Sequence, residues 1–177
     1  MPPKSQLAAV SPLGRYRQLA PIANVKVSPL CLGTMTFGEK QHSDYGEITK
    51  ATVMDILDRF YDQGGNFIDS ANVYQQGQSE EWIGEWMQKR GNRDDIVLAT
   101  KYSGHFPGAQ GRKGIEANWG GNGSKSLKLN LEASLKRLGT GYIDLYYVHW
   151  YVHCGGEQIM STPNSATGGT TRHQFRS

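Results

Sequence analysis

The sequence predicts an α/β fold built on a parallel β-sheet. Short apolar runs typical of strands begin near residues 30, 66, 96 and 143, so they recur at roughly the length of one strand–helix unit. Helical patterns stand between these runs, and a strand–helix–strand connection makes both strands parallel through a right-handed crossover. At 177 residues the chain suits one domain. The spacing fits a doubly wound sheet and a (β/α)₈ barrel equally well.

The chain begins with a predicted hairpin and then alternates strands with helices. Residues 1–14 are predicted to be disordered, and residues 15–30 contain two short strand patterns around a turn. The four strands that follow end in the sequences CLGT, FID, LATK and YVH. Three helices are predicted between them, over residues 49–65, 78–91 and 125–139.

Each predicted helix has an apolar set, and the first two also have a signal that marks one end. In the first helix, Gly64–Gly65 marks the end, and four apolar residues repeat at 3.6-residue spacing: Val53, Ile56, Leu57 and Phe60. In the second, Ser79 is the predicted N-cap and three residues are expected in the core: Trp82, Trp86 and Met87. In the third, four leucines lie on or near one face: Leu127, Leu131, Leu135 and Leu138.

The tips of the four predicted strands carry polar side chains. They are Gly33–Thr34, Asp69, Lys101 and His149. Because the carboxyl ends of parallel strands meet at one edge of the sheet, we expect these residues to lie close together. An ammonium at the tip of a buried strand needs a partner for its charge, and Asp69 can provide one. Tyr74 follows Asp69 by five residues, in the loop beyond the strand.

Such a group suits the protonation of a carbonyl oxygen. A free phenol titrates near ~10 and is a poor proton donor at neutral pH. A neighbouring ammonium stabilises the phenolate and makes the phenol a better acid, and a carboxylate keeps the ammonium charged and in place. A histidine can donate a hydrogen bond to the same carbonyl. The group contains no hydride, which a nicotinamide cofactor would have to supply.

Four stretches of the chain closely resemble the aldo-keto reductases. They are LCLGTMTFG, GGNFIDSANVYQQGQSEEWIGEWM, IVLATKY and YIDLYYVHW. Within the family, the likeness is to fungal aryl-alcohol dehydrogenases and norsolorinic-acid-reductase-like enzymes of secondary metabolism. The resemblance implies a TIM barrel that uses NADP(H) to reduce an aldehyde or ketone, or in reverse to oxidise an alcohol.

The resemblance also implies roles for single residues. Tyr74 would be the proton donor, Lys101 would make its phenol more acidic, Asp69 would support Lys101 at the nicotinamide, and His149 would orient the substrate. Cofactor-binding residues would include Asp69 and three residues at the first strand tip, which would line the nicotinamide pocket: Gly33, Thr34 and Met35.

The chain carries only half of the barrel's pattern. We find four strand patterns, whereas such a barrel has eight strands and typically about 250 residues. After Tyr151 the apolar periodicity stops and Gly, Ser and Thr dominate, so residues 152–177 are predicted to be a disordered or aberrant tail. The sequence therefore predicts a truncated barrel over residues 15–151, with much of the surface for the cofactor's phosphate and adenosine missing.

Three interpretations of function stay open from the sequence. The chain could be an active NADP-dependent reductase, an inactive truncated remnant of one, or a half-barrel subunit that pairs with another chain. Two open edges of a parallel sheet also predict self-association.

Composition, charge and cysteine spacing argue against several other classes of protein. A net charge of +3 with no Lys- or Arg-rich run argues against nucleic acid, and no apolar run approaches the ~18 residues of a membrane span. The N-terminus lacks the apolar core of a signal peptide. Cys31 and Cys154 have no framework spacing, which favours a cytoplasmic protein, and Cys31 is expected to be an apolar filler in its strand. His149 and His153 are four apart, but His149 ends a strand, so we expect no metal site.

Overall fold

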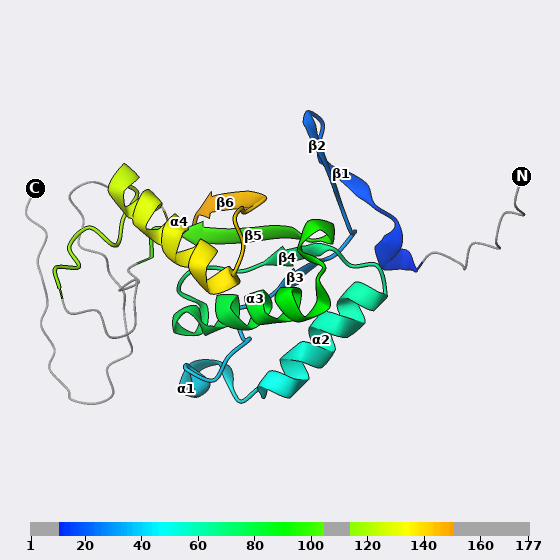
Figure 1. Cartoon of the computed structure of the whole chain (residues 1–177), viewed down its shortest axis with the longest axis horizontal. Helices are drawn as coiled ribbons and strands as arrows, with labels where there is room; N and C mark the ends of the chain where they lie inside the picture. Colours follow the sequence, from blue (N-terminus) through cyan, green and yellow to red (C-terminus); the bar gives the residue numbers. More distant parts are fainter. Residues whose placement is uncertain (1–10, 105–113, 151–177) are drawn as a thin grey trace, which may run out of the picture.

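The structure is a computed structural model that describes residues 11–104 and 114–150 of the chain. A small antiparallel hairpin precedes a parallel sheet and its helices (Figure 1). The hairpin consists of β1 (Arg17–Ala20) and β2 (Ala23–Val27), and the parallel sheet of β3 (Cys31–Gly33), β4 (Phe67–Asp69), β5 (Val97–Tyr102) and β6 (Leu145–Val148). The α-helices are α1 (His42–Tyr45), α2 (Lys50–Asp62), α3 (Gln78–Arg90) and α4 (Ser124–Leu138). Three short 3₁₀ helices complete the set: η1 (Pro12–Gly14), η2 (Tyr74–Gly77) and η3 (Arg93–Asp95).

The strand order decides between the two architectures that the spacing allowed. The order in space is β3-β4-β5-β6, which is also the order in the chain, and all three pairings are parallel. A doubly wound sheet reverses direction at a switch point, whereas a barrel adds each strand beside the previous one. The described sheet is therefore four consecutive strands of a barrel wall.

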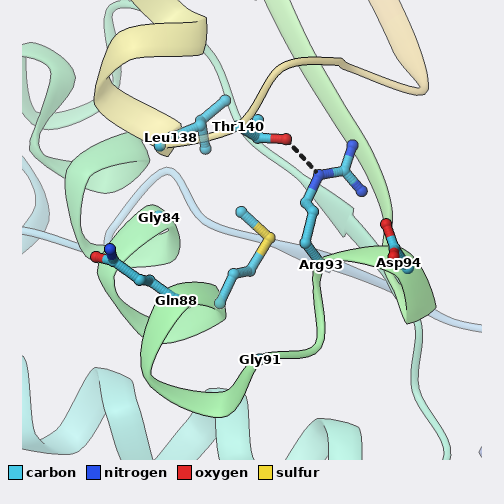
Figure 2. A pocket seen from close by; sticks show the side chains of 9 residues that line it. Gly84, Gln88, Gly91, Arg93, Asp94, Leu138 and Thr140 are labelled. Carbon is cyan, nitrogen blue, oxygen red and sulfur yellow. Dashed lines mark hydrogen bonds between the residues drawn. The ribbon is translucent and has the colours of Figure 1, made fainter.

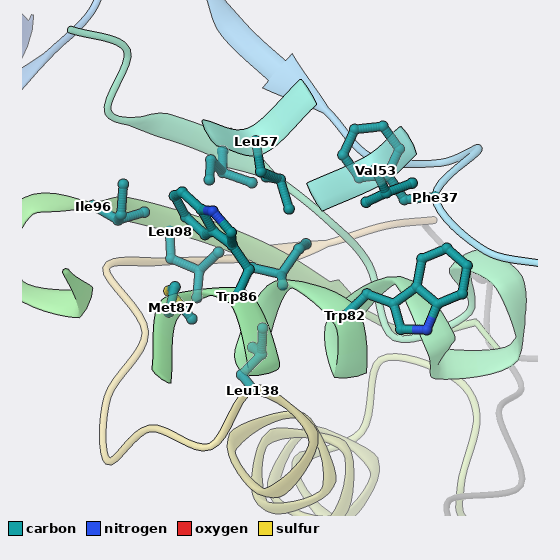
Figure 3. Close-up of a cluster of buried hydrophobic side chains, with 11 residues drawn as sticks. Phe37, Val53, Leu57, Trp82, Trp86, Met87, Ile96, Leu98 and Leu138 are labelled. Carbon is teal, nitrogen blue, oxygen red and sulfur yellow. The ribbon is translucent and has the colours of Figure 1, made fainter. Parts of the chain in front are cut away.

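The core lies between the sheet and the helices on one side of it (Figure 3). Strand residues on that face, such as Ile68 and Leu98, are fully buried against Val53 and Leu57 of α2. From α3 the core receives three residues that the sequence assigned to it: Trp82, Trp86 and Met87. Burial of each such side chain contributes about 1.5–3 kcal/mol, so this face holds the sheet and helices together.

The opposite face of the sheet is open along its two outer strands, β3 and β6. Side chains alternate between the two faces along a strand, and here Cys31, Gly33 and Tyr147 are exposed. The expectation that Cys31 is an apolar filler is therefore wrong, because its strand turns that position to the open face. Among the described residues, β3 pairs only with β4 and β6 only with β5, so each outer strand keeps one free edge.

The predicted N-cap of α3 is also wrong. The cap position is Gly77, whose φ of 89° lies in the left-handed region that glycine adopts without steric cost. Ser79 lies inside the helix, fully buried, and its hydroxyl donates to the carbonyl of Phe37 at 2.8 Å. By contrast, Gly64 ends the turn after α2 with a φ of 87°, at the position that the sequence indicated.

Helix α4 turns a different face inward from the one expected. Its buried residues are Ser126, Asn130, Ser134 and Leu138, while the other three leucines of the predicted face are only partly buried. The helix approaches α3 closely: a Cβ added to Gly84 would lie 2.6 Å from the carbonyl oxygen of Arg137. The two helix backbones are therefore in direct contact at Gly84. Among the described residues, no helix is long and apolar enough to cross a membrane.

Candidate active site

The predicted site residues lie at the carboxyl edge of the parallel sheet. Gly33 pairs with Asp69, and Asp69 pairs with Ala99, so the ends of β3 and β4 are level with the middle of β5. Lys101 follows Ala99 by two residues, so its side chain extends from the same face of the sheet as those of Ala99 and Asp69. His149 comes directly after β6, and its backbone N–H continues the ladder by donating to Tyr102 at 2.8 Å.

The Lys101 ammonium is the centre of the group. Its Nζ lies 2.7 Å from Asp69 Oδ2, 2.6 Å from the carbonyl oxygen of Ser70 and 3.2 Å from the Tyr74 hydroxyl. An ammonium has three protons to donate, so all three have an acceptor. The Lys101 and Asp69 side chains are only 15% and 28% exposed, which makes their ion pair less screened than one on the surface.

This arrangement decides where the phenolic proton can go. Because Lys101 donates to the Tyr74 oxygen, that oxygen acts as acceptor in this contact and its own O–H stays available to another partner. The ammonium also lies 4.8 Å from the centre of the Tyr74 ring, where the ring's negative face attracts it. The Tyr74 hydroxyl thus has a cation beside it and keeps its own proton free for another acceptor.

A continuation of the sheet ladder carries Tyr74 to this place. Ser70 N–H donates to Ala99 and Asn72 N–H donates to Lys101, both beyond the end of β4. Tyr74 N–H then closes a turn with the carbonyl of Ala71 at 3.2 Å. The loop therefore follows β5 rather than leaving the sheet, and it returns the phenol to the lysine.

His149 contacts Tyr74 edge to face. The ring centres are 5.6 Å apart at 84°, and the Trp150 ring stacks on the imidazole with its centre 5.1 Å away. Burial lowers the pKa of His149 below its ordinary 6.5, the Lys101 ammonium lowers it further, and the Asp69 carboxylate opposes both. His149 is therefore neutral near pH 7 and carries one N–H donor. Its Nδ1 is buried with no partner in the described part of the chain.

The three residues at the tip of β3 differ from one another. Thr34 is fully buried, and both its N–H and its hydroxyl donate to the carbonyl of Asp69 at 3.0 Å. Thr34 therefore holds the end of β4 through the Asp69 carbonyl, and its side chain lies in the interior rather than on the open face. Met35 is 44% exposed, and a Cβ added to Gly33 would meet nothing within 4 Å. Gly33 and Met35 therefore both border open space.

Two groups of supporting residues were missed by the sequence analysis. Glu80 of α3 is fully buried and accepts from Thr100 at 2.6 Å and from Arg137 at 2.6 and 2.7 Å. Behind the Tyr74 loop, the Asn72 side-chain amide donates to Asn130 at 2.8 Å. Polar residues at inward helical positions were the available signal, because they are rarely buried without a partner.

A separate pocket of about 270 Å³ lies at the other edge of the sheet, between the ends of α3 and α4 (Figure 2). Arg93 lines it, and its guanidinium donates to Thr140, Ile96, Tyr142 and Asp144 at 2.8–3.1 Å. The arginine is thus committed to joining neighbouring segments, and none of the predicted site residues lines this pocket.

Comparison with known proteins identifies the family. Residues 29–154 match the model described as "Aldo/keto reductase family". The chain is 59% identical over 136 residues to norsolorinic acid reductase B of Dothistroma septosporum, covering 77% of this chain and 34% of that protein. It is 51% identical over 148 residues to an aryl-alcohol dehydrogenase of Pestalotiopsis microspora, covering 84% and 36%.

A solved structure agrees with this match. The holo form of an aldo-keto reductase from Bacillus halodurans superposes with a TM-score of 0.58 at 33% identity, over 74% of this chain and 38% of that one. The predicted fold class, part of a (β/α)₈ barrel, is confirmed. The chain spans a little over a third of the length of these curated relatives. The chain belongs to the aldo/keto reductase family.

Proposed function

We propose that this chain carries the proton-donating site of an NADP(H)-dependent carbonyl reductase. The observation that carries the proposal is the Lys101 ammonium, which lies between Asp69 Oδ2 and the Tyr74 hydroxyl at 2.7 and 3.2 Å. A phenol with its proton free and a cation against its oxygen is arranged to protonate a developing alkoxide.

Each residue has one part in the reaction. The Tyr74 O–H donates its proton to the carbonyl oxygen, and the Lys101 ammonium stabilises the phenolate that remains. Asp69 holds that ammonium in place, and neutral His149 donates a hydrogen bond that orients the carbonyl beside Tyr74. In alcohol oxidation the same proton returns to the Tyr74 phenolate.

The residues beside this group suit a nicotinamide. The cofactor, when bound, supplies the hydride that these side chains lack. Gly33 and Met35 would border its ring on the open face of the sheet, and Asp69 would lie at its edge through the pair with Lys101. Thr34 would act indirectly, because its hydroxyl already donates to Asp69. The choice of NADP(H) over NAD(H) is part of the proposal.

The proposed substrate is an aryl aldehyde or a ketone of a fungal polyketide or terpenoid pathway. The names of the curated relatives, norsolorinic acid reductase and aryl-alcohol dehydrogenase, support this class. A cytoplasmic location is proposed with it, on the cysteine usage of the sequence.

Cofactor binding and turnover test the proposal together. NADPH added to the purified chain should quench tryptophan fluorescence, because Trp150 stacks on His149 at the site. NADPH oxidation should then depend on an added aromatic aldehyde. A chain that binds no NADPH at millimolar concentration would contradict the proposal and favour an inactive remnant.

Pairing with a second half-barrel is a further candidate role. The free edges of β3 and β6 support it, together with Val148, which is 50% exposed on the outer strand. Val148→Lys should weaken self-association seen by size exclusion with light scattering. Ile22→Lys is a matched control, since Ile22 is 99% exposed in the hairpin turn. A strictly monomeric wild-type chain at all concentrations would argue against pairing with itself.

A further inference from the structure

The two residues after Tyr74 have an unusual backbone. Gln75 has φ 49° and ψ 38°, and Gln76 has φ 55° and ψ 37°. Residues with a Cβ seldom adopt this left-handed conformation. When they do, surrounding contacts must hold it, and such positions gather at functional sites.

The contacts of Gln75 explain how its conformation is held. Its side chain is 1% exposed and exchanges hydrogen bonds with Gln41. Gln75 N–H donates to Gln41 Oε1 at 2.9 Å, and Gln41 N–H donates to Gln75 Oε1 at 3.0 Å. Gln75 Nε2 also donates to the carbonyl of Met35 at 3.2 Å. One buried amide thus binds both ends of the segment from Met35 to Gln41.

The same segment approaches Gln75 very closely at Gly38. A Cβ added to Gly38 would lie 2.5 Å from Gln75 Cβ, so only glycine allows the contact. Gln76, by comparison, is exposed although its backbone is nearly identical. The left-handed backbone alone therefore does not account for the burial of Gln75.

Gln75 stands between the two parts of the proposed site. It directly follows Tyr74 in the chain, and its side-chain amide donates to the carbonyl of Met35. Thr34, which precedes Met35, donates to the carbonyl of Asp69. We propose that Gln75 is a positioning residue whose amide fixes the separation between the Tyr74 phenol and the Met35 side of the nicotinamide pocket. This inference rests on the proposed function.

Hydrogen exchange and cofactor affinity test the coupling in three variants. Gln75→Gly removes the amide and also relieves the backbone, while Gln41→Ala removes one partner from outside the core. Gln76→Gly is the matched control, since it relieves the same backbone conformation without touching these contacts. We expect Gln75→Gly to speed exchange of the Gln41 N–H at least about tenfold. It should also raise the Kd for NADPH by about tenfold and lower kcat.

We expect Gln41→Ala to weaken NADPH binding in the same direction, and Gln76→Gly to change neither exchange nor affinity. If exchange rises in Gln75→Gly while Kd and kcat match those of Gln76→Gly, the contact is merely structural and the inference is overturned. Equal exchange in the two glycine variants would overturn it as well. A wild-type chain without NADPH binding instead refutes the proposed function, and the exchange comparison still decides whether Gln75 holds the Met35 segment.

Discussion

Replacing Tyr74 by phenylalanine tests the proton-donor role with the smallest change of shape. The variant keeps the ring, and with it the edge contact to His149 and the cation–π contact to Lys101. It removes only the hydroxyl that lies 3.2 Å from the Lys101 nitrogen. Because the proposed donor is this hydroxyl, and among the described residues no other phenol is hydrogen-bonded to the Lys101 ammonium, general-acid catalysis should be lost. The expected fall in the reduction rate is roughly 10²–10⁴-fold.

The same substitution should hardly change stability or cofactor binding. Lys101 keeps two of its three acceptors, Asp69 and the carbonyl of Ser70. The loss of one partly exposed hydrogen bond costs about 0.5–1.5 kcal/mol in the free energy of unfolding. The hydroxyl's proposed contact is with the substrate carbonyl, so the Kd for NADPH should change by less than about twofold, on the order of 0.4 kcal/mol.

The assay follows NADPH oxidation with an aromatic aldehyde, and urea unfolding checks that each variant is folded. Tyr61→Phe is a matched control, because it removes a hydroxyl that is hydrogen-bonded to Asp95 at 2.7 Å. Asp95 precedes β5 in the chain and lies away from the proposed site. A folded Tyr74→Phe chain that reduces the aldehyde as fast as wild type would refute the assignment. So would an equal loss of rate in Tyr61→Phe.

Three further predictions use groups around the site. Arg137→Met leaves the Glu80 carboxylate buried without its cation, so urea unfolding should show a loss of about 3 kcal/mol. His149 has a lowered pKa in the folded chain, so as the pH falls below 6.5 the imidazole is protonated in the unfolded chain before it is protonated in the folded chain. Stability should therefore rise with pH up to about 6.5, and His149→Gln should flatten that rise. Cys31 has its pKa raised from 9.0 to about 11 by partial burial and by Asp69. In a Cys154→Ser chain at pH 8, it should be alkylated roughly a hundredfold more slowly than an unperturbed thiol.

Each of these has an outcome that would contradict it. A loss in Arg137→Met no greater than in Arg59→Met, whose arginine is exposed on α2, would show that the Glu80 pair contributes little. An unchanged pH dependence in His149→Gln would mean that His149 is not the group that titrates. Alkylation of Cys31 at the rate of a free thiol would mean that partial burial and the Asp69 carboxylate do not raise its pKa.

Much of the fold and the edge that carries the site followed from the sequence, because the relevant rules are local. Strand and helix patterns are short-range, and parallel strands place their carboxyl ends together whatever the packing behind them. Lys101 and Asp69 could therefore be paired from spacing alone. The choice between barrel and doubly wound sheet could not, since it depends on where each new strand is added.

The inward face of α4 shows a second limit. Four leucines at helical spacing predict an apolar inward face, yet Asn130 and two serines occupy it. The Asn130 amide is paired inside the protein: it accepts from Asn72 at 2.8 Å and donates to the carbonyl of Trp119 at 2.8 Å. How deeply a helix face is buried depends on its neighbour as much as on its own pattern, so a single-helix pattern could not reveal it.

The support of the site was hidden for a related physical reason. Thr100 precedes Lys101 in β5, so its side chain faces the helices, where it donates to Glu80, and Glu80 in turn accepts from Arg137. From the sequence alone, Glu80 and Arg137 are expected at the surface, because charged side chains are rarely buried. In this fold they join β5, α3 and α4 directly behind the lysine, where a buried, fully paired network resists displacement more than a solvated one. The strand position that aims the ammonium at Tyr74 is thus held by polar contacts on the far side of the sheet.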